Sequence, residues 1–187
     1  MKILLFGKTG QIAKELCNRP NVTAIGRDKA DFTEPQKIIE IVKSTDADII
    51  INAVAYTTVD LAEEEFELAN IINGTTVKEL AKVSASRNIP FLHISTDYVF
   101  KGDGNLNWKT SDQTNPQNSY GKSKLIGESG ILEAGGPHVI LRTSWVFSSH
   151  GNNFVKTMLR LASNNNELSI IKDQIGGPTC AKDIADA

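Results

Sequence analysis

"KILLFGKTGQIA", residues 2–13, joins a short apolar run to a glycine-rich turn and the start of an amphipathic segment. The apolar run predicts a buried β-strand, and the segment from Gly10 onward predicts a helix. A turn of this kind needs glycine where the backbone approaches a pyrophosphate, and the helix N-terminus supplies N–H groups and a positive dipole. Gly7 and Gly10 meet this pattern, and the small Ala13 stands at its third position. The stretch therefore favours a dinucleotide site over the alternative, a tight strand-to-helix turn without a ligand.

The same alternation of apolar strands and helical segments continues along the chain. Further strands are predicted at 21–26, 46–55, 89–96 and 138–147, and helices at 34–45, 62–87, 118–135 and 152–165. Short apolar strands separated by helices predict an α/β fold, a Rossmann-like doubly wound parallel sheet with flanking helices. Near the end, "LSIIKDQIGGPT" (168–179) predicts a strand and a turn, and "AKDIADA" (181–187) predicts the start of a helix. We expect this last helix to be an interrupted one, because no cap follows it.

The composition limits the classes of partner. The 187 residues are 40% hydrophobic and 22% charged, with a formal net charge of -2. This describes one globular domain with a sizeable core, without the basic surplus of a nucleic-acid binder. The apolar runs are too short to span a membrane. Cys17 and Cys180 support no disulfide framework, so a cytoplasmic location is expected. No metal site is predicted.

The residues after the second strand bear on the choice of cofactor. An NAD-type site places an acidic residue at this strand end, whereas a nearby arginine accommodates the 2′-phosphate of NADP. Here the sequence reads Gly26, Arg27, Asp28. Arg27 can form charge-assisted hydrogen bonds to a phosphate, so NADP(H) is preferred over NAD(H). The alternative is a solvated turn in which Arg27 pairs with Asp28.

Two polar segments supply candidate catalytic residues. The fourth predicted strand ends in Thr96 and Asp97, at the same sheet edge as the glycine turn. Tyr120 and Lys124 stand four apart on the following helix and so share one face. A lysine ammonium beside a phenol lowers its pKa, and a threonine hydroxyl can donate to a developing alkoxide. Together they predict hydride transfer with proton delivery by tyrosine; the plainer reading is a turn followed by a helix start. His93, inside an apolar strand, is interpreted as a packing residue.

Several motifs in order carry a resemblance to a known family. They are "LLFGKTGQIAKEL", "AYTTVDLAE", "HISTDYVFKG", "YGKSKLIGE", "RTSWVF", "GNNFVKTMLRLA" and "DQIGGPT". With them the chain resembles the dTDP-4-dehydrorhamnose reductase family of the extended short-chain dehydrogenase/reductase superfamily. The resemblance implies that Thr96, Tyr120 and Lys124 are catalytic and that Thr96, Asp97 and Trp145 contact a dTDP-sugar substrate. It implies that the cofactor is lined by Gly10, Gln11, Ile12, Asp31, Phe32, Ala55, Tyr56, Thr57, Tyr120 and Lys124.

The implied reaction is reduction of the 4-keto group of dTDP-4-dehydro-β-L-rhamnose to dTDP-L-rhamnose by NAD(P)H. Tyr120 would protonate the oxygen, while Lys124 would hold Tyr120 and the nicotinamide ribose. Family members continue well past "DQIGGPT". Residues 1–187 are therefore expected to form the NAD(P)-binding domain with part of the substrate-binding region, the remainder of that region being absent. The resemblance leaves a homodimer open.

Two other functions remain open at this point. One is a non-catalytic NADP-binding regulatory subunit resembling the β subunit of methionine adenosyltransferase, which shares this fold and several motifs. The other is an extended reductase or epimerase acting on a different nucleotide sugar. The presence of Thr96, Tyr120 and Lys124 favours an enzyme over the subunit. The occurrence of "STDYVF" together with "RTSWVF" disfavours an enzyme for a different nucleotide sugar.

Overall fold

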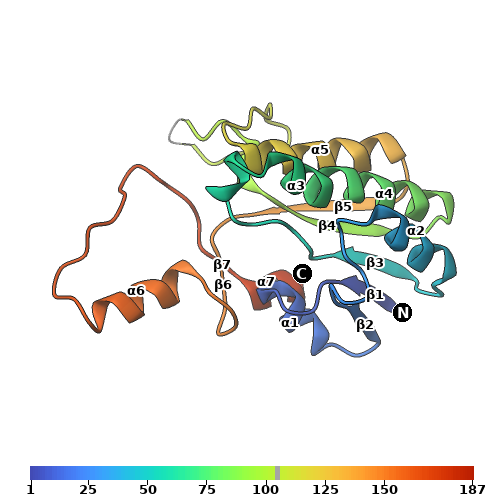
Figure 1. The fold of residues 1–187 in the computed structure, drawn as a ribbon, viewed down its shortest axis with the longest axis horizontal. Coiled ribbons are helices and arrows are strands. Elements are labelled where there is room, and N and C mark those ends of the chain that lie inside the picture. The colour runs from blue at the N-terminus through green and yellow to red at the C-terminus, as the bar shows by residue number, and fades with distance from the viewer. Residues whose placement is uncertain (104–105) are drawn as a thin grey trace.

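The computed structural model describes residues 1–103 and 106–187, and its centre is a parallel five-stranded sheet. The strand order is β2-β1-β3-β4-β5 (Figure 1). The strands are β1 (Ile3–Phe6), β2 (Val22–Ile25), β3 (Ile49–Asn52), β4 (Phe91–Thr96) and β5 (His138–Thr143). The order reverses between β1 and β3, and ligands of doubly wound sheets bind outside the carboxyl ends of the strands at such a point. The predicted fold class is confirmed.

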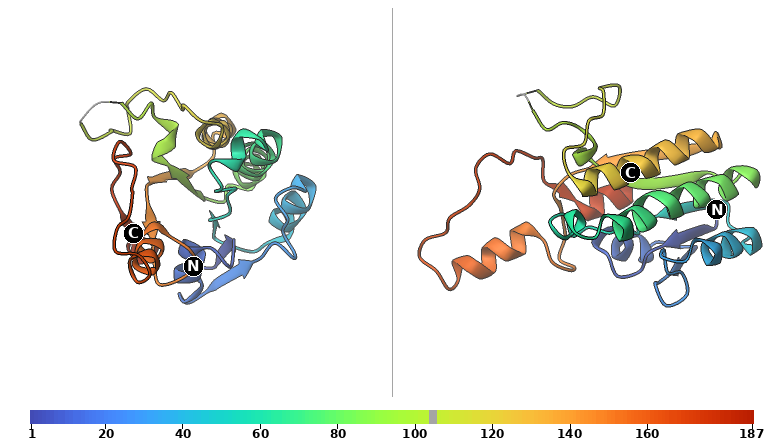
Figure 2. Two further views of the ribbon diagram at one scale, coloured as in Figure 1. Left: turned by 60° about the vertical axis from the view of Figure 1, so that its left-hand side comes forward. Right: turned by 45° about the horizontal axis from the view of Figure 1, so that its top comes forward.

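Helices cover both faces of this sheet (Figures 1 and 2). One face carries α2 (Pro35–Ser44), α3 (Phe66–Asn70), α4 (Thr76–Ser86) and α5 (Ser119–Ala134), and the other carries α1 (Gln11–Cys17) and α7 (Ala181–Asp186). None of the helices in the described residues is long and apolar enough to cross a membrane.

Alternating side chains along the strands build a separate core on each face. In β1, Leu4 and Phe6 join the core beneath α2 and α4, whereas Leu5 joins the core beneath α1. In β3, Ile50 and Ile51 divide in the same way. All five are 7% exposed or less, which explains why these strands are apolar throughout. Burial on both faces fixes the register of the strands, and thereby the position of the turns at their ends.

The helix predicted over 62–87 is interrupted in the structure. A short 3-10 turn, Leu61–Glu63, precedes α3, and a π-helical segment, Ile71–Thr75, separates α3 from α4. The π-helical turn brings the Asn73 carbonyl against α5, where a Cβ at Gly127 would collide with it. Glycine at this position therefore permits the close approach of α5, the helix that carries Tyr120 and Lys124.

The chain beyond β5 departs from the sequence prediction. The strand expected over 138–147 ends at Thr143, because Trp145 adopts a φ of 44°, and Val146–Phe147 (β6) then pairs with Thr179–Cys180 (β7). Between them, α6 (Phe154–Ala162) and the irregular residues 163–178 project from the sheet edge (Figure 2, right). The strand expected within 168–179 is confined to its last residue. We call residues 148–178 the arm.

Candidate active site

A cavity of about 1100 Å³ lies at the carboxyl ends of β1, β3 and β4 and is closed on one side by the arm. It brings together residues that the sequence predicts for cofactor, catalysis and substrate. The predicted residues that line it are Gly10, Gln11, Ile12, Ala55, Thr57, Thr96, Asp97, Tyr120, Lys124 and Trp145. The arm contributes an apolar wall that includes Phe154, Val155 and Met158.

The glycine turn has the geometry that a dinucleotide requires. Gly7 has a φ of +111°, and a Cβ there would lie 3.3 Å from the backbone of Ala53 at the end of β3. A Cβ at Gly10 would meet nothing within 4 Å, so the backbone at the start of α1 faces open space. Ala13 is 1% exposed and packs in the core beneath α1. The residues present therefore fit a bound dinucleotide: the turn is tight and leaves the helix start accessible from the cavity.

Gln11 connects this turn to the base of the arm. Its Nε2 donates to the Val146 carbonyl at 3.0 Å. Its Oε1 accepts hydrogen bonds from Ser148 Oγ at 3.1 Å and Asn153 Nδ2 at 2.9 Å. Asn153 also caps α6 by accepting from the Lys156 backbone N–H. The side chain of Gln11 thus joins the glycine turn to the wall that the arm contributes.

Thr96, Asp97 and Tyr120 meet in the cavity beside Tyr98. Thr96 Oγ1 lies 3.2 Å from Asp97 Oδ1 and accepts from the Tyr98 backbone N–H at 3.2 Å. The Tyr98 and Tyr120 rings meet edge to face with centroids 5.7 Å apart. Burial raises the pKa of Tyr120 to about 12, and the Thr96 hydroxyl opposes this rise. Burial also raises the pKa of Asp97. Tyr120 is therefore protonated at neutral pH and can serve as a proton donor.

Lys124 is held beneath the cavity floor by β4. Its Nζ donates to the Ile94 carbonyl at 2.7 Å and lies 3.0 Å from Nε2 of His93. His93 Nδ1 lies 3.1 Å from Asn52 Nδ2, and Asn52 stands at the end of β3. Burial lowers the pKa of Lys124 to about 7, although Glu128 opposes this effect. Burial is the largest cause of the pKa shift in both Tyr120 and Lys124, so the effect of Lys124 on the pKa of Tyr120 stays a prediction.

The contact of His93 with Lys124 was missed from the sequence, which favoured a packing role. His93 is 0% exposed, so it does pack, yet both of its ring nitrogens have polar neighbours. A signal was present: His93 and Ser95 are polar residues at alternate positions of an apolar strand. Residues i and i+2 of a strand lie about 6.7 Å apart, and i and i+4 of a helix about 6 Å. The pair therefore matches Lys124 and Glu128 on the facing helix.

Glu128 faces Ser95, as Lys124 faces His93. Its Oε1 accepts from Ser95 Oγ at 2.5 Å and from Arg142 Nε at 3.1 Å, and its Oε2 accepts from Arg142 Nη2 at 2.6 Å. The Glu128 side chain is 2% exposed and that of Arg142 is 22% exposed. Arg142 also lies over the Phe100 ring, with 4.8 Å from Cζ to the centroid. The carboxylate is thus bound by groups other than Lys124.

Trp145 lies where β5 leaves the sheet and the arm begins. Its φ of 44° is in the left-handed region, which bulky residues rarely adopt. The indole lies against Gly176, where a Cβ would be 2.5 Å from Nε1, and its ring centroid is 5.4 Å from that of Phe154. Strain of this kind concentrates at ligand sites. Trp145 lines the cavity together with Phe154 of the arm.

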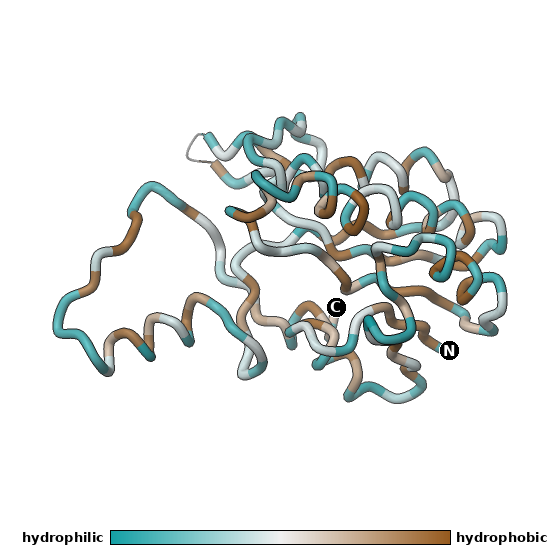
Figure 3. The backbone as a smooth tube through the Cα atoms, viewed as in Figure 1, coloured by the Kyte–Doolittle hydropathy of each residue, from teal (hydrophilic) through white to brown (hydrophobic). Residues whose placement is uncertain are grey.

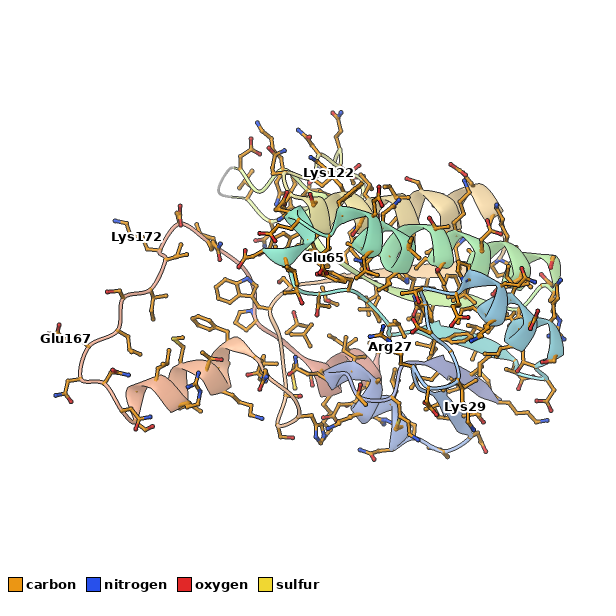
Figure 4. All side chains as sticks on the ribbon, viewed as in Figure 1. Arg27, Lys29, Glu65, Lys122, Glu167 and Lys172 are labelled. Carbon is orange, nitrogen blue, oxygen red and sulfur yellow. The ribbon has the colours of Figure 1, made fainter. Side chains whose placement is uncertain are left out.

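The remaining predicted cofactor residues do not line the cavity: Gly7, Arg27, Asp31, Phe32 and Tyr56. The Arg27 side chain is 80% exposed at the end of β2 and pairs with Asp31 at 3.1 Å rather than with Asp28 (Figure 4). The Thr33 backbone N–H, and then Arg27, lower the pKa of Asp31. Phe32 is 2% exposed and packs against Phe6, so its side chain belongs to the core. The cofactor roles of these five residues stay predictions.

The family comparison matches the whole chain. The sequence model of the family described as "RmlD substrate binding domain" matches residues 1–187. The chain is 47% identical over 194 residues to dTDP-4-dehydrorhamnose reductase of Escherichia coli K12 and 45% identical over 196 residues to that of Salmonella typhimurium LT2. Each alignment covers 100% of this chain and 65% of the relative, so the chain spans about two thirds of their length.

The fold is also similar to that of a solved dTDP-4-dehydrorhamnose reductase. The crystal structure of dTDP-4-dehydrorhamnose reductase from Bacillus anthracis in complex with NADP superposes with a TM-score of 0.94 at 36% identity. That alignment covers 100% of this chain and 69% of the other.

Proposed function

The chain belongs to the RmlD substrate binding domain family. We propose that it acts as an NADPH-dependent reductase of a 4-keto dTDP-sugar. The proposed substrate is dTDP-4-dehydro-β-L-rhamnose, the product is dTDP-L-rhamnose, and the proposed location is the cytoplasm. The observation that carries this proposal is the shared cavity. Thr96, Tyr120 and Lys124 line the same space as the turn Gly10–Ile12, so a proton donor and a dinucleotide turn face one volume.

The chain's own residues would divide the work as follows. NADPH, when bound, supplies the hydride. Tyr120 holds its proton at neutral pH and donates it to the substrate oxygen as that oxygen becomes an alkoxide. The Thr96 hydroxyl is positioned to turn from Asp97 toward the same oxygen. Trp145 and the apolar side chains of α6 exclude water from the cavity.

The test is NADPH oxidation by the protein in the presence of dTDP-4-dehydrorhamnose. Tyr120→Phe removes the acidic proton, and general acid catalysis is worth about 10²- to 10⁴-fold, so turnover should fall by that factor. NADPH affinity, measured by fluorescence titration, should change little and reports that the variant is folded. NADPH binding without oxidation by the wild type would contradict the enzyme and favour the non-catalytic subunit. Near-normal turnover of the variant would contradict the role of Tyr120.

The preference for NADP(H) over NAD(H) is proposed on Arg27. Its exposed guanidinium pairs with Asp31 near the end of β2, so a phosphate can replace that carboxylate. We expect Arg27→Ala to weaken NADPH about tenfold or more while NADH affinity stays constant, since a charge-assisted hydrogen bond is worth about 1.5–3 kcal/mol. Lys29→Ala is the matched control, because it removes another cation from the turn after β2 (Figure 4). An unchanged ratio of the two dissociation constants in Arg27→Ala would remove Arg27 as the phosphate reader.

A further inference from the structure

A buried chain of hydrogen bonds runs from the end of β3 to Lys124. The Val54 backbone N–H donates to Asn52 Oδ1 at 2.9 Å. Asn52 Nδ2 then lies 3.1 Å from His93 Nδ1, and His93 Nε2 lies 3.0 Å from Lys124 Nζ. Asn52 and His93 are 0% exposed and Lys124 is 1% exposed. Water therefore supplies none of these groups with an alternative partner, and each contact requires one donor and one acceptor.

The backbone fixes the direction of the first links. The Val54 N–H can only donate, so the oxygen of the Asn52 amide faces it and the NH₂ group faces His93. His93 Nδ1 must therefore accept. A neutral imidazole carries one N–H, which then resides on Nε2, and an imidazolium would oppose a donor to the Asn52 NH₂ group. His93 is thus the neutral Nε2–H tautomer, in agreement with a pKa that burial lowers well below its usual value.

The direction of the last link follows. An Nε2–H needs an acceptor, and an ammonium has no lone pair, whereas a neutral amine has one. We propose that the Asn52–His93 pair holds Lys124 as a neutral amine in the cofactor-free protein, so that His93 is a positioning residue that sets the charge of the catalytic lysine. The lowered pKa of Lys124, about 7, agrees with this assignment. The inference rests on the proposed function only in giving Lys124 its catalytic role.

Among the titratable groups around Lys124, Glu128 raises the lysine pKa and so opposes the neutral state, but its carboxylate is engaged by other groups. Glu128, one turn further along α5, is occupied by Arg142 from β5 and Ser95 from β4. Tyr120, one turn earlier, is neutral because burial raises its pKa to about 12. An ammonium at Lys124 would require the Asn52 amide to turn over, which would set its NH₂ group against the Val54 N–H. The charge of the lysine is thereby coupled to the backbone beside Ala53 and Ala55, which line the cavity.

The coupling has a chemical consequence for the proposed reaction. Without an ammonium at Lys124, Tyr120 keeps its proton in the free protein. The lysine lone pair is then available to take a proton from solvent when ligand oxygens in the cavity offer new acceptors. Tyr120 would gain its cationic neighbour only in the loaded site.

Nitrogen NMR of the wild-type protein tests the assignment directly. The chain contains only three histidines, His93, His138 and His150, so the imidazole signals are readily assigned with ¹⁵N-histidine labelling. At pH 8 the expected spectrum shows His93 protonated on Nε2 and unprotonated on Nδ1. As pH falls through about 7 and Lys124 takes up a proton, the His93 proton should move from Nε2 to Nδ1. Lys124 Cε, followed from pH 6 to 8, should titrate about three units below an ordinary lysine, as the pKa of about 7 indicates. At pH 8, a proton on Nδ1 of His93 or a fully charged Lys124 would overturn the proposal.

Asn52→Asp reverses the direction of the chain. A carboxylate accepts from both the Val54 N–H and His93 Nδ1–H, so Nε2 becomes an acceptor and Lys124 becomes an ammonium. The His93 proton should move to Nδ1 and the pKa of Lys124 should rise by about one unit or more. Asn118→Asp is the matched control at the N-cap of α5, where the side chain accepts from the Gly121 backbone N–H. It should change neither signal. Equal spectra for Asn52→Asp and wild type would overturn the proposal; if Asn52→Asp does not fold, the wild-type spectrum decides alone.

The spectra require no turnover, so the two proposals fail separately. The Nε2–H tautomer in a protein that does not oxidise NADPH sinks the proposed function and leaves the hydrogen-bond assignment intact. The Nδ1–H tautomer at pH 8 in an active protein sinks the assignment alone.

Discussion

The two walls of the cavity differ in which side chains they bury. The wall formed by β4 and α5 buries polar groups: Lys124, His93 and Glu128 are each 1% exposed or less. The arm, residues 148–178, contains no buried residue, and its large apolar side chains are exposed, including Leu159 at 68% and Ile171 at 68%. Figure 3 shows the apolar positions of the arm recurring along α6 and beyond it, away from either core.

The β4–α5 wall therefore positions the proposed catalytic groups, whereas the arm only surrounds them. A buried polar group without a partner is costly, so each residue of the β4–α5 wall constrains its neighbour and the geometry is strongly determined. The arm is connected to the body through the Gln11 hydrogen bonds, the Ser144–Gly177 hydrogen bond, the contact of His150 with Glu15 and the short β6–β7 pair. Removing a partner should therefore be severe in the first wall and mild in the second.

The largest effect is expected from Arg142→Met. Arg142 is the charged partner of Glu128, and breaking a buried ion pair costs about 3–5 kcal/mol because the other charge stays buried. The free energy of unfolding from urea titration measures this cost. Arg160→Met, the same substitution on exposed α6, is the matched control and should change stability by less than about 0.5 kcal/mol. Equal costs at the two positions would mean that the two walls do not differ.

Lys124→Met should show a pH-dependent effect in the same wall. The folded-state pKa of Lys124 is about 7, against 10.5 for an ordinary lysine, so between these values the unfolded chain binds more protons. Lys124 therefore lowers stability fully below pH 7, and this penalty disappears as pH rises toward 10.5. The variant lacks the penalty, so its stability relative to wild type should rise by about 2 kcal/mol when pH falls from 9 to 7.

Lys122→Met is the control for that measurement. Lys122 stands two residues earlier on α5 and projects outward from the upper surface (Figure 4). Its removal should leave the pH dependence of stability unchanged. A flat difference between Lys124→Met and wild type across the same pH range would show that Lys124 is not desolvated in the folded protein.

The same contrast explains what the sequence could and could not predict. Strands buried on both faces can be predicted from their apolar residues. The sequence also predicted Gly10, Thr96, Tyr120 and Lys124 as site residues, and the structure places them around one cavity, while their roles stay predictions. The direction of the chain at Trp145 was not predicted, because a positive φ at a tryptophan has no local sequence signal. The β5 boundary was therefore set too late.

The partners of Arg27 and His93 were equally difficult to predict from the sequence. The partner of Arg27 is Asp31 rather than its neighbour Asp28, and His93 meets Lys124 across 31 positions of sequence. The contact between His93 and Lys124 depends on the packing of α5 on β4, which no periodicity of the sequence reveals.

A smaller effect is expected where the glycine turn meets the base of the arm. Gln11→Ala removes the hydrogen bonds to Val146, Ser148 and Asn153, and with about 0.5–1.5 kcal/mol for each bond the loss should be felt mainly as opening of the arm. Hydrogen exchange should quicken at the base of the arm and stay constant in β1 and β3. Gln36→Ala, on the exposed side of α2, should change neither region. Equal acceleration throughout the sheet would show that Gln11 supports the whole fold rather than this junction.

The smallest effect is expected from Leu159→Ala on α6. Its side chain is 68% exposed, so truncation removes little buried area and should cost less than about 0.5 kcal/mol. The same change at Leu80, which is 0% exposed on α4, leaves a cavity and should cost about 2–5 kcal/mol. If Leu159→Ala instead approached Leu80→Ala, α6 would be covered in solution. Repeating the titration at several protein concentrations would then identify the cover, because an effect that grows with concentration means a second copy, and a constant effect means that the arm folds back onto its own body.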